Sequence, residues 1–184
     1  MNLDFKHLFN KILCLPTNST KYTFQPLIPI EWQLILISDG SFTQNLNSLK
    51  GKRIQIEVLS SSSNSKIEKK NIIREVWIKD NQENKLAFAQ SLWPNNNIKG
   101  KNYNYIKLPQ YQAIGQSLIE LKIDTYKDIH EIYYGYCTYL ENNFNYNGPI
   151  WGRKYTIYKN RQRFVTIQEI FSPQIINFFN LKTQ

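Results

Sequence analysis

An arginine lies among the apolar residues of one predicted strand. In "IIREVWI", strand alternation places Arg74 on the same face as Ile72, Val76 and Ile78. A buried guanidinium is costly unless an anion pairs with it, and its planar fork suits a carboxylate held by two parallel hydrogen bonds. Arg74 is therefore a candidate anion-binding residue.

Two further polar side chains interrupt apolar strand faces. In "FVTIQEIF", Glu169 shares a face with Ile167, and in "LAFAQSL", Gln90 shares a face with Phe88. Three inward polar groups indicate a lined pocket. Two alternatives stay open at this point, since Arg74 and Glu169 could pair with one another, or both could lie on solvated faces. The pattern by itself indicates an anion pocket and no particular reaction.

Other residues with reactive side chains do not form a motif. His7 and His130 lack nearby metal ligands, and Cys14 and Cys137 are far apart and have no metal-ligand spacing. "AIGQS" (113–117) contains one glycine and does not match a phosphate-binding loop. We therefore expect neither a metal nor a cofactor, and any reaction would be cofactor-independent.

The composition sets limits on the class of protein. At 184 residues with 41% apolar residues, the chain fits one domain over residues 1–184. No run approaches the roughly 20 apolar residues of a membrane helix. The formal charge of +9 fits either a nucleic-acid partner or attraction of a dianionic small molecule. Because nucleic-acid binding rests on charge alone, we expect a small-molecule ligand and no nucleic acid. We also expect a monomer.

The hydrophobic periodicity predicts an α+β fold, with a single mainly antiparallel sheet of about six strands and helices packed on one side. Helices are expected at 4–15, 29–37, in a short segment ending near Gly51, and at 109–121. Strands are expected at 52–59, 71–79, 85–93, 131–139, 150–158 and 163–171, with a polar hairpin connection at 60–70.

Several segments, in this order and spacing, resemble the chorismate lyase family, and in particular its branch in cyanobacteria and red-algal plastid genomes. The resemblance runs from about Trp32 to Pro173. The segments that carry it are "SDGSFTQNL" (38–46), "REVWI" (74–78), "AFAQSLWP" (87–94), "AIGQSL" (113–118), "IWGRKYTI" (150–157) and "IQEIFSP" (167–173).

This resemblance implies a cofactor-independent lyase that splits chorismate into 4-hydroxybenzoate and pyruvate. It implies that Arg74 holds the ring carboxylate and that Glu169 faces the other end of the ring. It also implies that the backbone of Ile114 and the side chain of Phe42 complete the pocket. The same resemblance implies that the product feeds plastoquinone synthesis. The resemblance and the composition together predict a location in the plastid stroma, or otherwise the cytoplasm.

One departure from the family pattern concerns Gln90, which stands where bacterial members commonly carry an arginine. Losing that charge would weaken binding of the second carboxylate of chorismate, and Arg153 is a candidate to compensate. The competing hypothesis is a non-catalytic binding domain for small aromatic acids, as in bacterial transcription regulators of the same fold. That reading expects a DNA-binding domain, for which the roughly thirty residues before Trp32 are too few.

Overall fold

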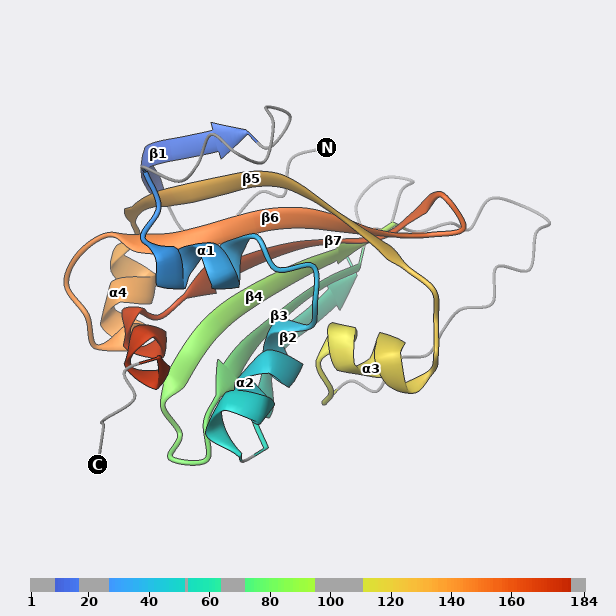
Figure 1. Ribbon diagram of the computed structural model, residues 1–184, viewed down its shortest axis with the longest axis horizontal. Helices are drawn as coiled ribbons and strands as arrows, with labels where there is room; N and C mark the ends of the chain where they lie inside the picture. The colour runs from blue at the N-terminus through green and yellow to red at the C-terminus, as the bar shows by residue number, and fades with distance from the viewer. Residues whose placement is uncertain (1–8, 17–26, 52, 64–71, 95–110, 180–184) are drawn as a thin grey trace.

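The computed structural model describes residues 9–16, 27–51, 53–63, 72–94 and 111–179 (Figure 1). Its strands are β1 (Asn10–Pro16), β2 (Gln55–Ser63), β3 (Ile72–Lys79), β4 (Lys85–Trp93), β5 (Tyr126–Tyr136), β6 (Ile150–Lys159) and β7 (Gln162–Phe171). Its helices are α1 (Ile30–Leu36), α2 (Phe42–Lys50), α3 (Ile114–Glu120), α4 (Thr138–Phe144) and the 3-10 helix η1 (Pro173–Phe178).

These strands form one antiparallel sheet in the order β1-β5-β6-β7-β4-β3-β2. Its two central hairpins have tight turns. Asp80 closes the β3–β4 turn, since its Oδ1 accepts hydrogen bonds from the backbone N–H groups of Gln82 and Asn84. Asn160 and Arg161 close the β6–β7 turn with positive φ at both positions, which suits the twist of a hairpin. The predicted α+β class and antiparallel sheet are confirmed.

The helix expected at 4–15 is wrong where the structure describes it, since residues 10–16 form β1. Residues 4–8 lie outside the described part. Leu13 and Leu15, two positions apart, pack against the core, whereas Ile12 is 61% exposed. A short apolar run fits both periodicities, and here the unpaired edge of β5 supplies backbone partners along β1. This added strand brings the sheet to seven.

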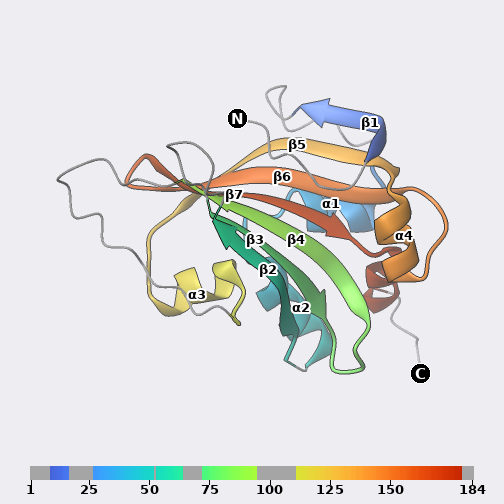
Figure 2. The ribbon, with the colours of Figure 1, turned by 180° about the vertical axis from the view of Figure 1, so that it is seen from behind.

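The two faces of the sheet carry separate apolar clusters. α1, α2 and α3 cover one face, where Trp32, Phe42 and Leu118 are buried. α4 covers the opposite face, where Leu140 and Phe144 pack with Trp77 and Phe88 (Figure 2). The strand expected at 131–139 ends at Tyr136, and α4 occupies residues 138–144, where no helix was expected. Of the four α-helices in the described part of the chain, α4 therefore lies on the opposite face from α1, α2 and α3.

The remaining element boundaries differ from expectation by a few residues at most ends. The strand expected at 52–59 is β2, which runs on to Ser63, and residues 64–70 of the expected connection lie outside the described part. The helix expected at 109–121 is described from Ile114 to Glu120, and residues 109–110 are not described. Within the described ranges, no helix has the length and apolarity to cross a membrane.

Candidate functional site

A cavity of about 400 Å³ lies on the sheet face that α2 and α3 cover. Strands β3, β4, β6 and β7 supply its floor, and the segment between α1 and α2 supplies part of its wall. Its lining is mostly apolar, with Phe42, Val76, Ile78, Ala89, Ile114, Leu118, Tyr155, Ile157 and Ile167, and its charged residues are Asp39, Arg74, Lys127 and Glu169. This size and mixture are typical of a small-molecule site.

Arg74 projects from β3 into this cavity, as the alternation of "REVWI" predicts. Val76 and Ile78 line the same cavity from the same strand. The Arg74 Nη2 donates a hydrogen bond to the carbonyl oxygen of Gln112 at 3.1 Å. Burial lowers the pKa of the guanidinium, because leaving water disfavours the charged form. A bound anion would offset this cost.

Glu169 lies in the middle strand, β7, and is 6% exposed. Its Oε2 accepts hydrogen bonds from Nε and Nη2 of Arg153, both at 2.8 Å, and its Oε1 accepts one from the hydroxyl of Tyr155 at 2.9 Å. Burial and the nearby carboxylate raise the pKa of Tyr155 well above its usual value, so this hydroxyl remains a donor. The counter-charge of the buried glutamate is thus Arg153.

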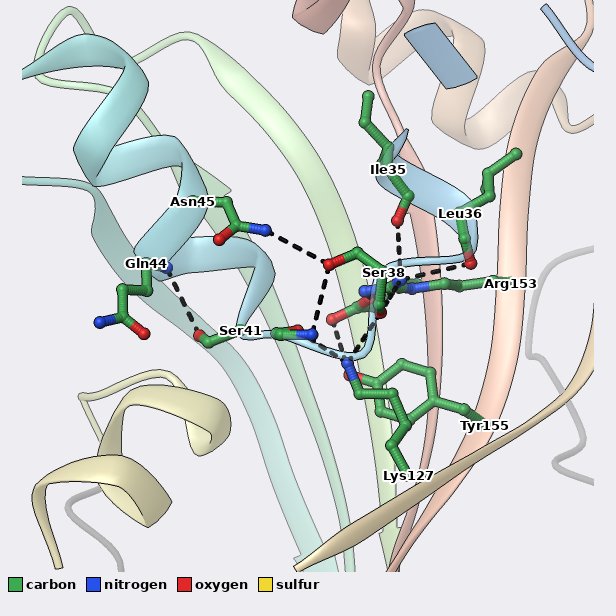
Figure 3. A network of polar contacts seen from close by, with 11 residues as sticks. Ile35, Leu36, Ser38, Ser41, Gln44, Asn45, Lys127, Arg153 and Tyr155 are labelled. Carbon is green, nitrogen blue, oxygen red and sulfur yellow. Dashed lines mark hydrogen bonds and ion pairs between the residues drawn. The ribbon is translucent and has the colours of Figure 1, made fainter. Parts of the chain in front are cut away.

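Arg153 also ties α1 to the sheet (Figure 3). Its Nη1 donates to the carbonyl oxygens of Ile35 at 2.7 Å, Leu36 at 3.3 Å and Ser38 at 3.1 Å. The last carbonyl groups of a helix have no partner within the helix, so a cation at this end satisfies them. Arg153 lies next to the cavity and holds Glu169 and the α1–α2 segment in place. These contacts occupy its guanidinium.

Phe42 and Ile114 begin α2 and α3, and both line the cavity. The Phe42 ring packs edge-on against Phe171, with centroids 4.8 Å apart. The first residues of the two helices lie close together: a Cβ added to Gly115 would be 2.8 Å from the Ser41 Oγ. Glycine at this position lets α3 reach the N-cap of α2.

The structure therefore brings four of the five predicted site residues to one cavity, namely Phe42, Arg74, Ile114 and Glu169. The fifth, Gln90, is not among the residues that line this cavity. Cross-strand partners share a face, and Gln90 is opposite Glu75 on β3 and Gln168 on β7. Its Nε2 donates to the Glu75 Oε1 at 3.0 Å, on the face that α4 covers.

Lys127 is a cavity residue that the sequence patterns did not reveal. The predicted strand began at Glu131, whereas β5 starts at Tyr126 and places Lys127 on the cavity side. Its Nζ donates to the carbonyl oxygens of Gly40 at 2.8 Å and Ser38 at 3.3 Å (Figure 3). Burial, and next the charge of Arg153, lower the pKa of Lys127 to about 8. The alternation of Lys127 with Ile129 was the available signal.

Within the described part of the chain, no group of three or more His, Cys, Asp or Glu side chains is placed to hold a metal ion. The cavity instead presents cations, a buried carboxylate and apolar walls. Such a site can hold a small carboxylate-bearing ring by charge-assisted hydrogen bonds at its polar ends and by apolar contact in between.

Two solved structures share this arrangement of elements. The effector domain of PhnF from Mycobacterium smegmatis superposes with a TM-score of 0.54 at 8% identity, over 76% of this chain and 92% of that one. The gene product SA0254 from Staphylococcus aureus subsp. aureus N315 gives 0.51 at 13% identity, over 74% and 90%. At these identities the likeness shows a shared fold alone.

Sequence comparison gives the family. The ycf21 protein of Antithamnion sp. is 40% identical over 178 residues, which is 97% of this chain and 98% of that protein. The ycf21 protein of Cyanophora paradoxa is 34% identical over 160 residues, with 81% and 80% covered. The family model described as "Chorismate pyruvate-lyase Rv2949c-like" matches residues 36–179, which include every cavity residue named above. The chain therefore belongs to the Rv2949c-like chorismate pyruvate-lyase family.

Proposed function

We propose that this protein is a chorismate lyase that converts chorismate into 4-hydroxybenzoate and pyruvate. The observation that carries the proposal is that Arg74 and Glu169 face one apolar cavity. Arg153 is the ion-pair partner of Glu169, and Arg74 lines the cavity from another strand, where its guanidinium can meet a ligand carboxylate. Family membership supplies the identity of the ring.

The reaction breaks the ether bond between ring carbon C3 and the enolpyruvyl oxygen of chorismate. The electrons of that bond become the carbonyl π bond of pyruvate. The neighbouring ring carbon C4 loses its hydrogen as a proton, and the bonding electrons left behind complete the aromatic ring. The enolpyruvyl C=C π electrons form the new bond to that proton on the methylene carbon, which becomes the pyruvate methyl group. Aromatisation drives this process without a redox cofactor or a metal.

The proposed contribution of the protein is positioning. Arg74 would hold the ring carboxylate by two parallel hydrogen bonds. Glu169 would accept a hydrogen bond from the ring hydroxyl through Oε1, which has a second lone pair beyond the one engaged by Tyr155, whereas Oε2 already meets two nitrogens of Arg153. Phe42 and Ile114 would contact the ring faces and exclude water. Fixing the enolpyruvyl arm beside the C4 hydrogen then lowers the entropic part of the barrier.

The resemblance to the cyanobacterial and red-algal plastid branch, and the algal sources of the relatives, support a location in the plastid. We propose that the chain acts as a single-domain monomer in the plastid stroma, where 4-hydroxybenzoate would enter plastoquinone synthesis.

Incubation of the purified protein with chorismate, followed by chromatography of 4-hydroxybenzoate, tests the proposal. We expect product from the native protein and from Arg163→Ala, which removes an exposed charge of β7. We expect Arg74→Ala to lose about 100-fold or more in kcat/KM, since it removes a charged, bidentate contact. Glu169→Ala should lose activity as well, with circular dichroism showing that each variant is folded.

The shared fold with the PhnF effector domain favours a second candidate, a domain that binds a small aromatic acid without turnover. The same experiment separates the two. Absence of product from the native protein, together with 4-hydroxybenzoate binding that Arg74→Ala abolishes, would favour the binding domain.

A further inference from the structure

Lys127 and Arg74 reach the cavity from opposite sides of Glu169. In the sheet order β5-β6-β7-β4-β3, Lys127 lies on β5, Glu169 on the middle strand β7, and Arg74 on β3. Strands β5 and β3 are four inter-strand spacings apart, and at about 4.8 Å per spacing this is roughly 19 Å across the sheet. Both side chains line the same cavity, so its positive charges stand at two ends with the buried carboxylate between them.

The ammonium of Lys127 is held in place by backbone oxygens. It has three donors, and the carbonyl oxygens of Ser38 and Gly40 accept from it. Its Nζ also lies 4.8 Å from the centroid of the Tyr155 ring. Among the described residues, no carboxylate accepts a hydrogen bond from this Nζ. Because carbonyl oxygens carry no net charge, these hydrogen bonds position the ammonium without neutralising it.

The other charges near Lys127 leave that role open. Glu169 is neutralised by Arg153 through two contacts of 2.8 Å. Asp39, on the segment between α1 and α2, is exposed, so water screens its carboxylate. The guanidinium of Arg153 is engaged by Glu169 and by the carbonyl groups at the end of α1. Lys127 is therefore better placed than Arg153 to meet a second anion.

We propose that Lys127 binds a second carboxylate, so that the site selects a ring dianion over a ring monoanion. The name of this ligand rests on the proposed function: the ring carboxylate of chorismate would lie on Arg74, and the enolpyruvyl carboxylate, attached beside the hydroxyl-bearing carbon, would lie on Lys127. The aromatic product has lost that second carboxylate, so of the two cations it would contact Arg74 and not Lys127. Lys127 thereby distinguishes substrate from product.

Two stable probes test this inference without turnover. 3-(Carboxymethoxy)benzoate carries a ring carboxylate and an ether-linked carboxylate, and benzoate carries the first alone. Isothermal titration calorimetry would compare both probes on the native protein, Lys127→Met, Lys127→Arg and Lys154→Met. Lys154 is the matched control, because alternation places it on the opposite face of the sheet from Arg153.

The native protein should bind the dianion more tightly than benzoate. Lys127→Met should weaken the dianion about 10- to 100-fold and leave benzoate within about twofold, the loss expected for one charge-assisted contact. Lys127→Arg should restore most of the dianion affinity, and Lys154→Met should change neither probe. With chorismate, Lys127→Met should raise KM, while the inhibition constant of 4-hydroxybenzoate stays the same.

Equal weakening of both probes by Lys127→Met would show that Lys127 only shapes the segment around Gly40, and would overturn the inference. So would unchanged binding of both probes, or a native protein without preference for the dianion. If the native protein makes no 4-hydroxybenzoate but still requires Lys127 for the dianion, the lyase proposal fails and the second-anion site stands.

Discussion

Replacing Arg153 with methionine should be strongly destabilising, because it breaks a buried ion pair from one side. The Arg153 side chain is 1% exposed and that of Glu169 is 8% exposed. Without the guanidinium, the carboxylate retains only the Tyr155 hydroxyl among the contacts described above, and the carbonyl groups of Ile35 and Leu36 lose their donor. Breaking a buried pair in this way costs about 3–5 kcal/mol.

Urea unfolding followed by circular dichroism measures this cost. With a denaturant slope of about 2 kcal/mol per molar urea, the midpoint of Arg153→Met should fall by about 1.5–2.5 M. The double variant Arg153→Met/Glu169→Gln should lose about 1–3 kcal/mol less unfolding free energy than the two single variants lose together, since it leaves neither charge unpaired. A loss below about 1 kcal/mol for Arg153→Met, the worth of an exposed pair, would refute this reasoning, as would simple additivity.

Three further outcomes are expected, each from a different contact in the structure. Lys127, with a pKa of about 8, binds an anion in its protonated form. Affinity for the dianionic probe should therefore be constant below that pKa and fall about tenfold between about pH 7 and 9. Calorimetry at both pH values should show unchanged affinity for benzoate. Gln90→Leu should leave 4-hydroxybenzoate affinity within about twofold and lower the unfolding free energy by about 1–3 kcal/mol, since it removes a buried partner of Glu75. Gly152→Ala should cost about 1–3 kcal/mol in urea unfolding, because its Cβ would lie 2.4 Å from the buried ring of Tyr133.

Strand alternation found Arg74 and Glu169 because it is a local property. Each stands among apolar neighbours two positions away, and both do line the cavity. The same rule correctly placed Gln90 and Phe88 on one face of their strand, but it could not predict which side of the sheet that face covers. The pairing of Gln90 with Glu75 and Gln168 decided it, and strand register is set by segments distant in the chain.

The N-terminal segment shows the same limit. The apolar residues of 10–16 fit a helix and a strand alike, and the choice was made by the backbone edge of β5, more than a hundred residues away. The start of β5 was likewise missed, and with it Lys127.

The sequence by itself determined the sheet period, the polar residues that interrupt apolar strand faces, and the family, because each depends on short segments of the chain. Only the tertiary structure decided that Arg153 neutralises Glu169 while reaching Ile35, 118 positions away, and that Lys127 meets Ser38 across 89 positions. Charge pairing in a cavity depends on which distant segments lie side by side, and no local periodicity records that.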